Sequence, residues 1–249
     1  MGELLKDKVA VVTGAGHGLG QAIALRFASE GAKIVIFEIS EERAADTMNK
    51  LKEMNAIAKS YVVDIADFSI IQPTVKEIVD TFGRIDIWVN NAGIIHNAAI
   101  EDVDIPGWDR LLDINLKAVF FWSQEVFKVM KAQNYGKFVH MSSLAGLRAG
   151  RISAADYTAS KSGVLGVSRC LALGGAKFGI TSNAICPGLI RTGMVNMTEE
   201  RRAELAQEIP MGRFGVPDEV AKVALFLASD LSSYVTGAYI SVNGGQYIN

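Results

Sequence analysis

Cysteine and histidine are scarce in this chain of 249 residues, which holds two of the first and three of the second. Cys170 and Cys186 stand apart in apolar surroundings and lack the C-x-x-C spacing of a metal or redox motif. We therefore expect both to be reduced thiols in the core. His17, His96 and His140 are equally scattered, so the sequence indicates no metal site.

Long hydrophobic runs and clusters of one charge are also missing. No apolar segment approaches the roughly 18–20 residues that span a bilayer. The net charge of −2 comes without a basic cluster, which argues against a nucleic-acid partner. The opening segment lacks the layout of a secretory signal, and Lys6 stands where a myristoylation signal has Ser or Thr. These absences predict a cytoplasmic protein that binds neither membrane nor nucleic acid.

What the sequence does contain is a regular alternation of strand-like and helix-like segments. Short β-branched runs end at Thr13, Phe37, Val63, Asn90, Met141, Ile185 and Val242. Amphipathic stretches lie between them, at residues 21–30, 41–55, 69–82, 113–130, 157–173 and 217–228. This order predicts an α/β fold, a single-domain Rossmann-type doubly wound parallel sheet with helices on both faces.

We find no linker or repeat, so residues 1–249 are expected to form one dinucleotide-binding and catalytic domain. The least regular part is the segment 188–215, which is too long for a simple connection. Long excursions of this kind often cover an active site. We therefore expect a substrate lid at about 188–215.

A glycine-rich turn follows the first strand. The stretch TGAGHGLG, residues 13–20, leads into the first expected helix, with glycines at 14, 18 and 20. Glycines allow a phosphate to approach the backbone at a helix N-terminus. The spacing differs from the common G-x-G-x-x-G fingerprint, and an ordinary tight turn is the alternative interpretation.

Glu38 ends the second expected strand, about 20 residues beyond these glycines. A carboxylate at that place accepts hydrogen bonds from ribose hydroxyls and repels a 2′-phosphate. His17 lies where a fixed cation would attract that phosphate. We therefore predict NAD rather than NADP as cofactor, although a solvated, helix-capping Glu38 remains the alternative.

Tyr157 and Lys161, in YTASK, lie four residues apart in a segment with helical periodicity. That spacing puts both side chains on one face, with about 5–6 Å between their β-carbons. A nearby ammonium favours a phenolate and lowers the pKa of a phenol from its usual value near 10. This pairing suits an acid/base catalyst, but a buried Tyr beside a snorkelling Lys explains the same pattern.

Taken in order, four motifs make the chain resemble the short-chain dehydrogenase/reductase family over its whole length. They are TGAGHGLG, then NNAG at residues 90–93, then Ser143 with Tyr157-x-x-x-Lys161, and finally CPGLIRT at residues 186–192. The nearest members in appearance reduce 3-oxoacyl thioesters or oxidise secondary alcohols and polyols.

The resemblance implies four catalytic residues. Asn115 matches the residue whose backbone helps to hold a proton-relay water, and Ser143 the serine that binds the substrate oxygen. Tyr157 matches the acid/base and Lys161 its partner, which also binds ribose. The residues implied to bind the cofactor are Gly14, His17, Gly18, Leu19, Gly20, Glu38, Asp64, Ile65, Asn91, Ala92, Gly93, Tyr157, Lys161, Pro187, Gly188, Ile190 and Thr192. No metal is implied.

Substrate recognition is expected above the carboxyl ends of the strands. The candidate walls are residues 94–96, 144–151, 189, 194, 195 and 197. Ser143 and Tyr157 stand 14 positions apart, one more than in many members of the family, which leaves the specificity open. Arg148 and Arg151 indicate an anionic substrate if they face inward and nothing if they face solvent.

These observations predict an NAD-dependent alcohol dehydrogenase/carbonyl reductase that acts on a small-molecule secondary alcohol or ketone. The alternatives are an NADP-dependent 3-oxoacyl-carrier-protein reductase and, more remotely, a dinucleotide-binding protein without catalysis. Apolar residues on several faces of the segments 113–130 and 157–173 suggest subunit contacts. The resemblance adds the expectation of a homotetramer.

Overall fold

The computed structural model describes residues 3–95, 98–149, 154–192 and 197–248. Its strands join one seven-stranded parallel sheet in the order β3-β2-β1-β4-β5-β6-β7. The strands are β1 (Val9–Thr13), β2 (Lys33–Glu38), β3 (Ala58–Val62), β4 (Ile87–Asn90), β5 (Gly136–Met141), β6 (Ile180–Pro187) and β7 (Tyr239–Val242).

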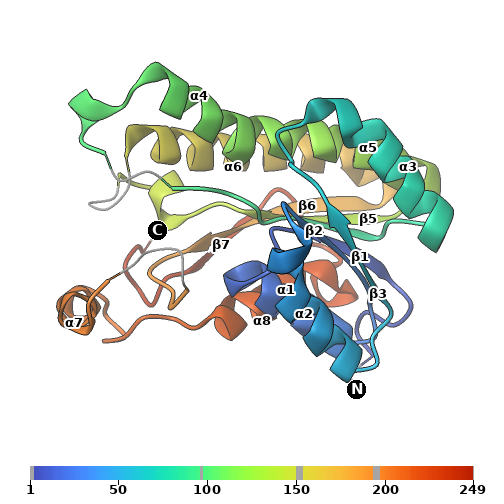
Figure 1. Ribbon diagram of the computed structural model, residues 1–249, viewed down its shortest axis with the longest axis horizontal. Helices are drawn as coiled ribbons and strands as arrows, with labels where there is room; N and C mark the ends of the chain where they lie inside the picture. The colour runs from blue at the N-terminus through green and yellow to red at the C-terminus, as the bar shows by residue number, and fades with distance from the viewer. Residues whose placement is uncertain (1–2, 96–97, 150–153, 193–196, 249) are drawn as a thin grey trace.

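Helices cover both faces of this sheet (Figure 1). One layer holds α1 (Gly18–Ser29), α2 (Glu41–Glu53) and α8 (Pro217–Ala228). The other holds α3 (Ile71–Phe82), α4 (Ile105–Leu112), α5 (Ala118–Gln133) and α6 (Ala155–Gly175). A further helix, α7 (Glu199–Gln207), lies to one side of the layers, beyond the end of β7 in this view. The doubly wound architecture predicted from the sequence is therefore confirmed.

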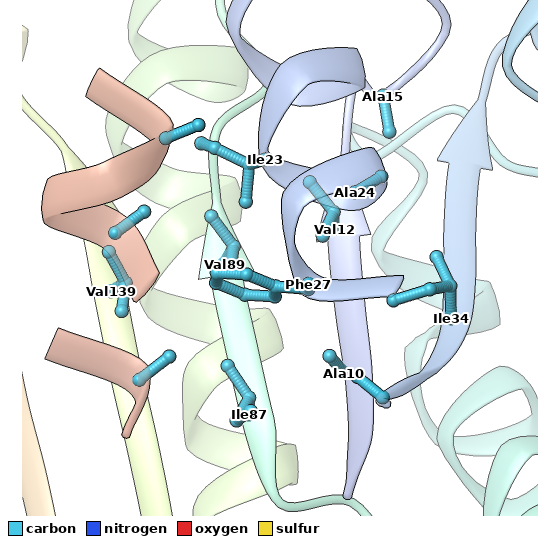
Figure 2. Close-up of a cluster of buried hydrophobic side chains, with 14 of the residues drawn as sticks. Ala10, Val12, Ala15, Ile23, Ala24, Phe27, Ile34, Ile87, Val89 and Val139 are labelled. Atoms are coloured by element: carbon cyan, nitrogen blue, oxygen red, sulfur yellow. The ribbon is translucent and has the colours of Figure 1, made fainter. Parts of the chain in front are cut away.

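Alternate residues of the strands supply the two cores, because successive side chains of a strand point to opposite faces. Ala10 and Val12 pack with Ile23 and Phe27 of α1, as Figure 2 shows. On the other face of the sheet, β1 packs with α3 and α5, and this second core includes the stacked rings of Trp88 and Trp122. This two-sided burial explains why the strands read as continuous apolar runs.

The sheet reverses its winding at β1, which pairs with β2 on one side and with β4 on the other. The chain after β1 and the chain after β4 therefore leave the sheet in opposite directions. Such a switch point opens a crevice at the carboxyl ends of the strands, where ligands bind in open α/β sheets.

A polar chain crosses the sheet inside the second core. The imidazole Nδ1 of His140 on β5 lies 3.0 Å from the amide nitrogen of Asn90, and its Nε2 lies 3.0 Å from Ser182 Oγ. Asn90 in turn accepts from Trp88 and donates to Ser123 Oγ. Full burial lowers the pKa of His140 to about 3, so this ring is neutral.

Most expected elements are found near their predicted positions, with two differences. The segment expected as one helix from residue 113 begins with a π-helical turn, Asp113–Lys117, before α5. The expectation of two core thiols is wrong for Cys170, which is exposed, whereas Cys186 is buried. Cys170 lies on the outer side of α6, away from the buried positions Val164, Ser168 and Ala172.

In the described part of the chain, no helix is both long and apolar enough to cross a membrane.

Candidate active site

A cavity of about 840 Å³ lies at the carboxyl ends of the strands. It is lined by every residue predicted to bind the cofactor except Gly20, and by three of the four predicted catalytic residues, Ser143, Tyr157 and Lys161. Gly20 packs behind the loop instead, where a β-carbon would lie 2.2 Å from the Gly14 carbonyl oxygen. Asn115 is fully buried next to the cavity.

The glycine loop needs its glycines for conformation and for close contact. Gly14 and Gly18 adopt φ angles of 63° and 60°, which side-chain-bearing residues rarely adopt. A β-carbon on Gly14 would also lie 2.9 Å from the α-carbon of Ala92. The loop therefore lies directly against the turn that follows β4, and it exposes backbone to the cavity.

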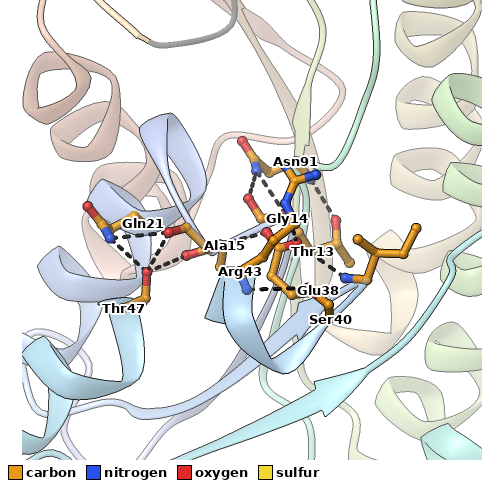
Figure 3. A network of polar contacts seen from close by, with 11 residues as sticks. Thr13, Gly14, Ala15, Gln21, Glu38, Ser40, Arg43, Thr47 and Asn91 are labelled. Carbon is orange, nitrogen blue, oxygen red and sulfur yellow. Dashed lines mark hydrogen bonds and ion pairs between the residues drawn. The ribbon is translucent and has the colours of Figure 1, made fainter. Parts of the chain in front are cut away.

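Side chains from two neighbouring elements hold this loop in place (Figure 3). Asn91, after β4, donates from its amide nitrogen to the carbonyl oxygens of Thr13 and Gly14 at 2.8 and 2.9 Å. The buried Thr47 hydroxyl, from α2, lies 2.8 Å from the Ala15 carbonyl oxygen and accepts from Gln21 Nε2 at 2.8 Å. These hydrogen bonds between protein groups hold the glycine loop in its conformation.

Glu38 lies at the end of β2, as predicted, but it is buried, so the interpretation as a solvated capping residue is wrong. Its Oε1 accepts from the Gly16 backbone N–H at 2.7 Å, and its Oε2 accepts from that of Ile39 at 3.2 Å. Arg43, from the first turn of α2, also approaches Oε2, with its Nε at 3.6 Å. The strand end therefore carries a carboxylate and a guanidinium side by side (Figure 3).

Asp64 follows β3 at the same end of the cavity. Its Oδ1 accepts from the backbone N–H of Ala66 at 2.9 Å, which shapes the turn. Its Oδ2 pairs with the Arg110 guanidinium of α4 at 3.3 Å, and both side chains are largely exposed. This end of the cavity thus has two acidic residues, each paired with an arginine from a neighbouring helix.

Ser143, Tyr157 and Lys161 meet at the opposite end. Ser143 follows β5 and begins a short 3₁₀ turn, Leu144–Gly146, in which its hydroxyl oxygen accepts from the Ala145 N–H at 3.1 Å. Tyr157 and Lys161 come from the first turns of α6, and the Lys161 ammonium lies 5.7 Å from the centre of the Tyr157 ring. The Lys161 Nζ donates to the Met141 carbonyl oxygen at 2.9 Å.

Burial sets the proton affinities of this pair. It raises the pKa of the Tyr157 phenol, and a hydrogen bond with Ser143 opposes that rise. It lowers the pKa of the Lys161 ammonium to about 8, with the nearby Cys186 opposing the change. The sequence interpretation expected Lys161 to lower the pKa of Tyr157, whereas in the protein alone desolvation raises it.

Asn115 lies in the π-helical turn before α5. Its Oδ1 accepts from the Ile94 N–H and its Nδ2 donates to the Ile94 carbonyl oxygen, both at 2.8 Å. A further contact reaches Ser160 Oγ at 3.3 Å. The side chain thus joins the turn after β4 to α6 and satisfies buried backbone. π-turns of this type are frequent at functional sites.

The rest of the cavity is mainly apolar. Among the predicted walls, the lining residues are Ile94, Ile95, Leu144, Ala145, Arg148, Ala149, Leu189 and Met197. His96, Gly150, Arg151, Met194 and Val195 lie outside the described residues. The sequence interpretation missed Arg202 and Leu205 of α7 and Glu208 directly after it, together with Phe214 and Gln246.

The segment expected to be a lid is tied at both ends to the chain around β7. The Gly188 N–H donates to the Val242 carbonyl oxygen at 3.0 Å, and the Leu189 N–H donates to Gln246 Oε1 at 3.2 Å. Towards its other end, the Met211 N–H donates to the Gly244 carbonyl oxygen at 3.1 Å.

Among residues 3–95, 98–149, 154–192 and 197–248, no group of three or more His, Cys, Asp or Glu side chains gathers where it could hold a metal ion. The polar side chains that line the cavity can form hydrogen bonds and transfer protons.

Comparison with known proteins places this geometry among oxidoreductases. The family model described as enoyl-(acyl carrier protein) reductase matches residues 14–246. The 3-oxoacyl-[acyl-carrier-protein] reductase FabG of Thermotoga maritima is 40% identical over 245 residues, which cover 98% of this chain and 99% of the relative. The (2S)-[(R)-hydroxy(phenyl)methyl]succinyl-CoA dehydrogenase subunit BbsD of Thauera aromatica is 37% identical, with 97% of each chain covered.

Solved structures agree with these relatives. The crystal structure of levodione reductase superposes with a TM-score of 0.93 at 35% identity, over 97% of this chain and 98% of the other.

Proposed function

Since the chain belongs to the short-chain dehydrogenase/reductase family, we propose that it is an NAD-dependent alcohol dehydrogenase/carbonyl reductase. It transfers a hydride between nicotinamide and a secondary alcohol or ketone, with Tyr157 as acid/base. One observation carries this proposal: Ser143, Tyr157 and Lys161 line the same cavity as the glycine loop.

The residues present fit a nicotinamide dinucleotide, which members of the family bind. Gly14 and Gly18 leave the backbone open at the start of α1, where a pyrophosphate is favoured. Glu38 and Asp64 lie at the end of the cavity that suits an adenosine, and Lys161 and Thr192 lie toward the reacting end. The bound nicotinamide would supply the hydride donor for reduction and the acceptor for oxidation.

The chain's own residues supply the proton transfer. Tyr157, whose pKa is raised by burial, holds its proton at neutral pH and delivers it to the carbonyl oxygen during reduction. The Ser143 hydroxyl donates to the same oxygen and stabilises the charge that develops there. Lys161 keeps a positive charge close to Tyr157, which favours the phenolate that remains. Oxidation uses the same groups in reverse.

NAD is proposed as the preferred cofactor because the buried Glu38 carboxylate would repel a 2′-phosphate. The second candidate, an NADP-dependent 3-oxoacyl-carrier-protein reductase, is favoured by the similarity to the Thermotoga maritima reductase and by Arg43, a cation beside Glu38. The cytoplasmic location and the homotetramer stay predictions.

Replacing Tyr157 tests the proposed reaction. Tyr157→Phe removes the proton donor and keeps the ring, so kcat should fall at least about 100-fold while the affinity for NADH changes little. The measurement follows reduced-nicotinamide absorbance with NAD and NADP across secondary alcohols, polyols and 3-oxoacyl thioesters.

The matched control is Tyr135→Phe, because the ring of Tyr135 packs against Lys8 and does not line the cavity. It should keep wild-type turnover. Full activity of Tyr157→Phe would contradict the assignment of the proton donor. Dinucleotide binding without turnover on the whole panel would support the non-catalytic alternative.

A further inference from the structure

We propose that the substrate carries an oxyanion, such as a carboxylate, sulfonate or phosphate, and that Arg148 and Arg202 bind it. This inference rests on the proposed function, because it names the class of substrate that the same cavity takes. The two arginines come from separate elements and line the same cavity as the catalytic groups.

Arg148 is held at a fixed place relative to the reacting end. The 3₁₀ turn that begins at Ser143 is closed by the Gly146 N–H, which donates to the Ser143 carbonyl oxygen at 2.9 Å. The Arg148 N–H then donates to the Leu144 carbonyl oxygen at 3.1 Å. Arg148 is thus carried by the same short, hydrogen-bonded turn as Ser143.

The Arg148 guanidinium has no hydrogen bond or ion pair with any residue that the structure describes, although its side chain lines the cavity. An arginine offers five N–H donors in a planar fork, which matches the oxygens of a carboxylate or phosphate. Arg148 is therefore available for a ligand.

Arg202 faces the cavity because of the way α7 packs. Leu205 and Ile209, three and seven positions later, are buried against Phe214, with Leu189 and Met197 packed on the same cluster. This packing turns the Arg202 face of the helix inward, and its side chain is 28% exposed. Its partner Glu199, one turn earlier, is 72% exposed. Because exposed ion pairs are weak, a substrate anion can replace Glu199.

The charge distribution of the cavity supports an anionic ligand beyond the cofactor. The described lining contains six Lys or Arg residues, namely Arg43, Arg110, Arg148, Lys161, Arg191 and Arg202. It contains three acidic residues, Glu38, Asp64 and Glu208, and each of them already interacts with a partner, Arg43 for Glu38 and Arg110 for Asp64. This excess of positive charge lies in a chain whose net charge is −2.

Apolar side chains lie on the same walls as these arginines, so the ligand should be amphipathic. Leu144 belongs to the turn that carries Arg148, Leu189 and Phe214 pack with α7, and Ile94 also lines the cavity. Apolar walls lower the local dielectric and strengthen the attraction between a guanidinium and an anion. The oxyanion can belong to a short oxo acid or sulfonate, or to the phosphate of a pantetheine arm on an acyl thioester.

Matched pairs of substrates separate these sources. One pair is a short-chain oxo acid and its methyl ester. The other is a 3-oxoacyl-4′-phosphopantetheine and the same thioester of pantetheine without phosphate. Each compound is assayed for kcat and KM, and its dissociation constant in the presence of the dinucleotide is measured by calorimetry, so that an absence of turnover does not hide binding.

The wild type should prefer the charged member of one pair by about 10-fold or more in kcat/KM, since hydrogen bonds to a charged group are stronger than those to a neutral one. Arg148→Ala and Arg202→Ala should each remove most of this preference by raising the KM and the dissociation constant of the charged member. Both variants should weaken binding of the charged member much more than that of the neutral member, so the ratio between the two is the readout. Arg202→Lys should retain part of the preference, because it keeps the charge and loses the fork.

Arg201→Ala is the matched control. Arg201 precedes Arg202 on α7 and also pairs with a glutamate on the same helix, but it does not line the cavity. It should leave the preference unchanged. Equal binding of charged and neutral members, or a preference that survives both cavity variants, overturns the inference. If neutral ketones are still turned over in a Tyr157-dependent manner, the proposed function stands without this inference. If no compound is turned over in a Tyr157-dependent manner, the proposed function itself is overturned.

Discussion

Arg43 and Glu38 lie side by side at the end of β2, five positions apart in the sequence. The carboxylate is buried and also holds the Gly16 N–H, so it shapes the glycine loop as well as the charge of the cavity. A β-carbon on Gly16 would lie 2.2 Å from the Arg43 carbonyl oxygen, which shows how closely α2 and the loop pack. Changes at Glu38 therefore alter geometry and charge together unless the substitution preserves shape.

Glu38→Gln is the substitution that separates the two effects. The amide oxygen can still accept from Gly16, but the negative charge is lost and Arg43 loses its ionic partner. We expect the ratio of kcat/KM for NADPH over NADH to rise by about 10-fold or more, because repulsion of the 2′-phosphate is removed. Steady-state kinetics with both cofactors measures the ratio.

Two further variants control this experiment. Arg43→Ala in the Glu38→Gln background should reverse most of the gain, because the cation that attracts the phosphate is gone. Glu42→Gln removes an equal charge from an exposed neighbouring position and should leave the ratio within about 2-fold. An unchanged ratio in Glu38→Gln would show that this carboxylate does not decide the cofactor.

The positions of many site residues could be predicted from the sequence, because the carboxyl ends of parallel strands meet at one edge of a sheet. Thr13, Glu38, Asp64, Asn91 and Ser143 each end or follow a strand, so their strand positions were enough to bring them together. Contributions from α2 and α7 were missed, because no strand end marks them. Whether Thr47 of α2 reaches the glycine loop, and whether Arg202 of α7 faces the cavity, depends on how each helix packs, which a periodic pattern does not determine.

At the scale of the elements, β4, β5 and β6 are joined by side chains as well as by their backbone ladder. His140 connects Asn90 of β4 to Ser182 of β6, and Ser182 lies 3.2 Å from Ser168 of α6. Since Asn90 donates to Nδ1, the other nitrogen, Nε2, carries the proton and donates to Ser182. A second proton on the ring would place two donors face to face.

This arrangement makes the free energy of unfolding depend on pH. The pKa of His140 is about 3 in the folded protein and about 6.5 in an unfolded chain, so between these values only the unfolded chain binds the proton. The free energy of unfolding should therefore fall as the pH drops below about 6.5, by up to about 1.4 kcal/mol per pH unit from this residue. Urea unfolding between pH 7 and pH 5 measures the slope.

Removal of the titrating ring should flatten that slope. His140→Asn and His140→Gln will differ from each other in absolute stability, because each repacks the polar chain differently. Both should lose the same part of the pH dependence below about pH 6.5. If either variant keeps the wild-type slope, the acid sensitivity has another source.

The elements themselves were well predicted from the sequence because apolar periodicity decides strand or helix over most of the chain. The π-helical turn at Asp113–Lys117 was not predicted. Its cause is tertiary: Asn115 reaches the Ile94 backbone across a turn from another part of the chain. Local propensity contains no signal for such a contact.

On the scale of the whole molecule, the outer side of α5 and α6 is unusually apolar. Phe120 and Phe121 of α5 are 40% and 39% exposed, and Leu173 of α6 is 87% exposed. The Phe121 ring also lies 5.9 Å from that of Phe68, so the aromatic surface continues toward the residues before α3. A surface of this type suits a symmetric contact with another copy, in keeping with the proposed homotetramer.

Charges placed on that surface test the proposed assembly. Leu173→Asp and Phe121→Asp should weaken association at least about 10-fold, because burial of each apolar side chain is worth about 1.5–3 kcal/mol and a buried charge is costly. Light scattering after size-exclusion chromatography measures the mass at several protein concentrations. Ile57→Asp, at a 60% exposed site before β3, should leave the mass unchanged. A wild type that elutes as a monomer would contradict the proposal.

The ties between the segment 188–215 and the chain around β7 have a consequence for biosynthesis. Val242, Gly244 and Gln246 hold Gly188, Leu189 and Met211, and they leave the ribosome after all the other described residues that line or support the cavity. The glycine loop, Ser143 and Tyr157 can therefore assemble on a growing chain before the hydrogen bonds between β7 and the segment 188–215 form. A nascent chain arrested before residue 242 would lack these hydrogen bonds, so the part of the cavity wall that the segment 188–215 supplies is held in place only once the last described strand is made.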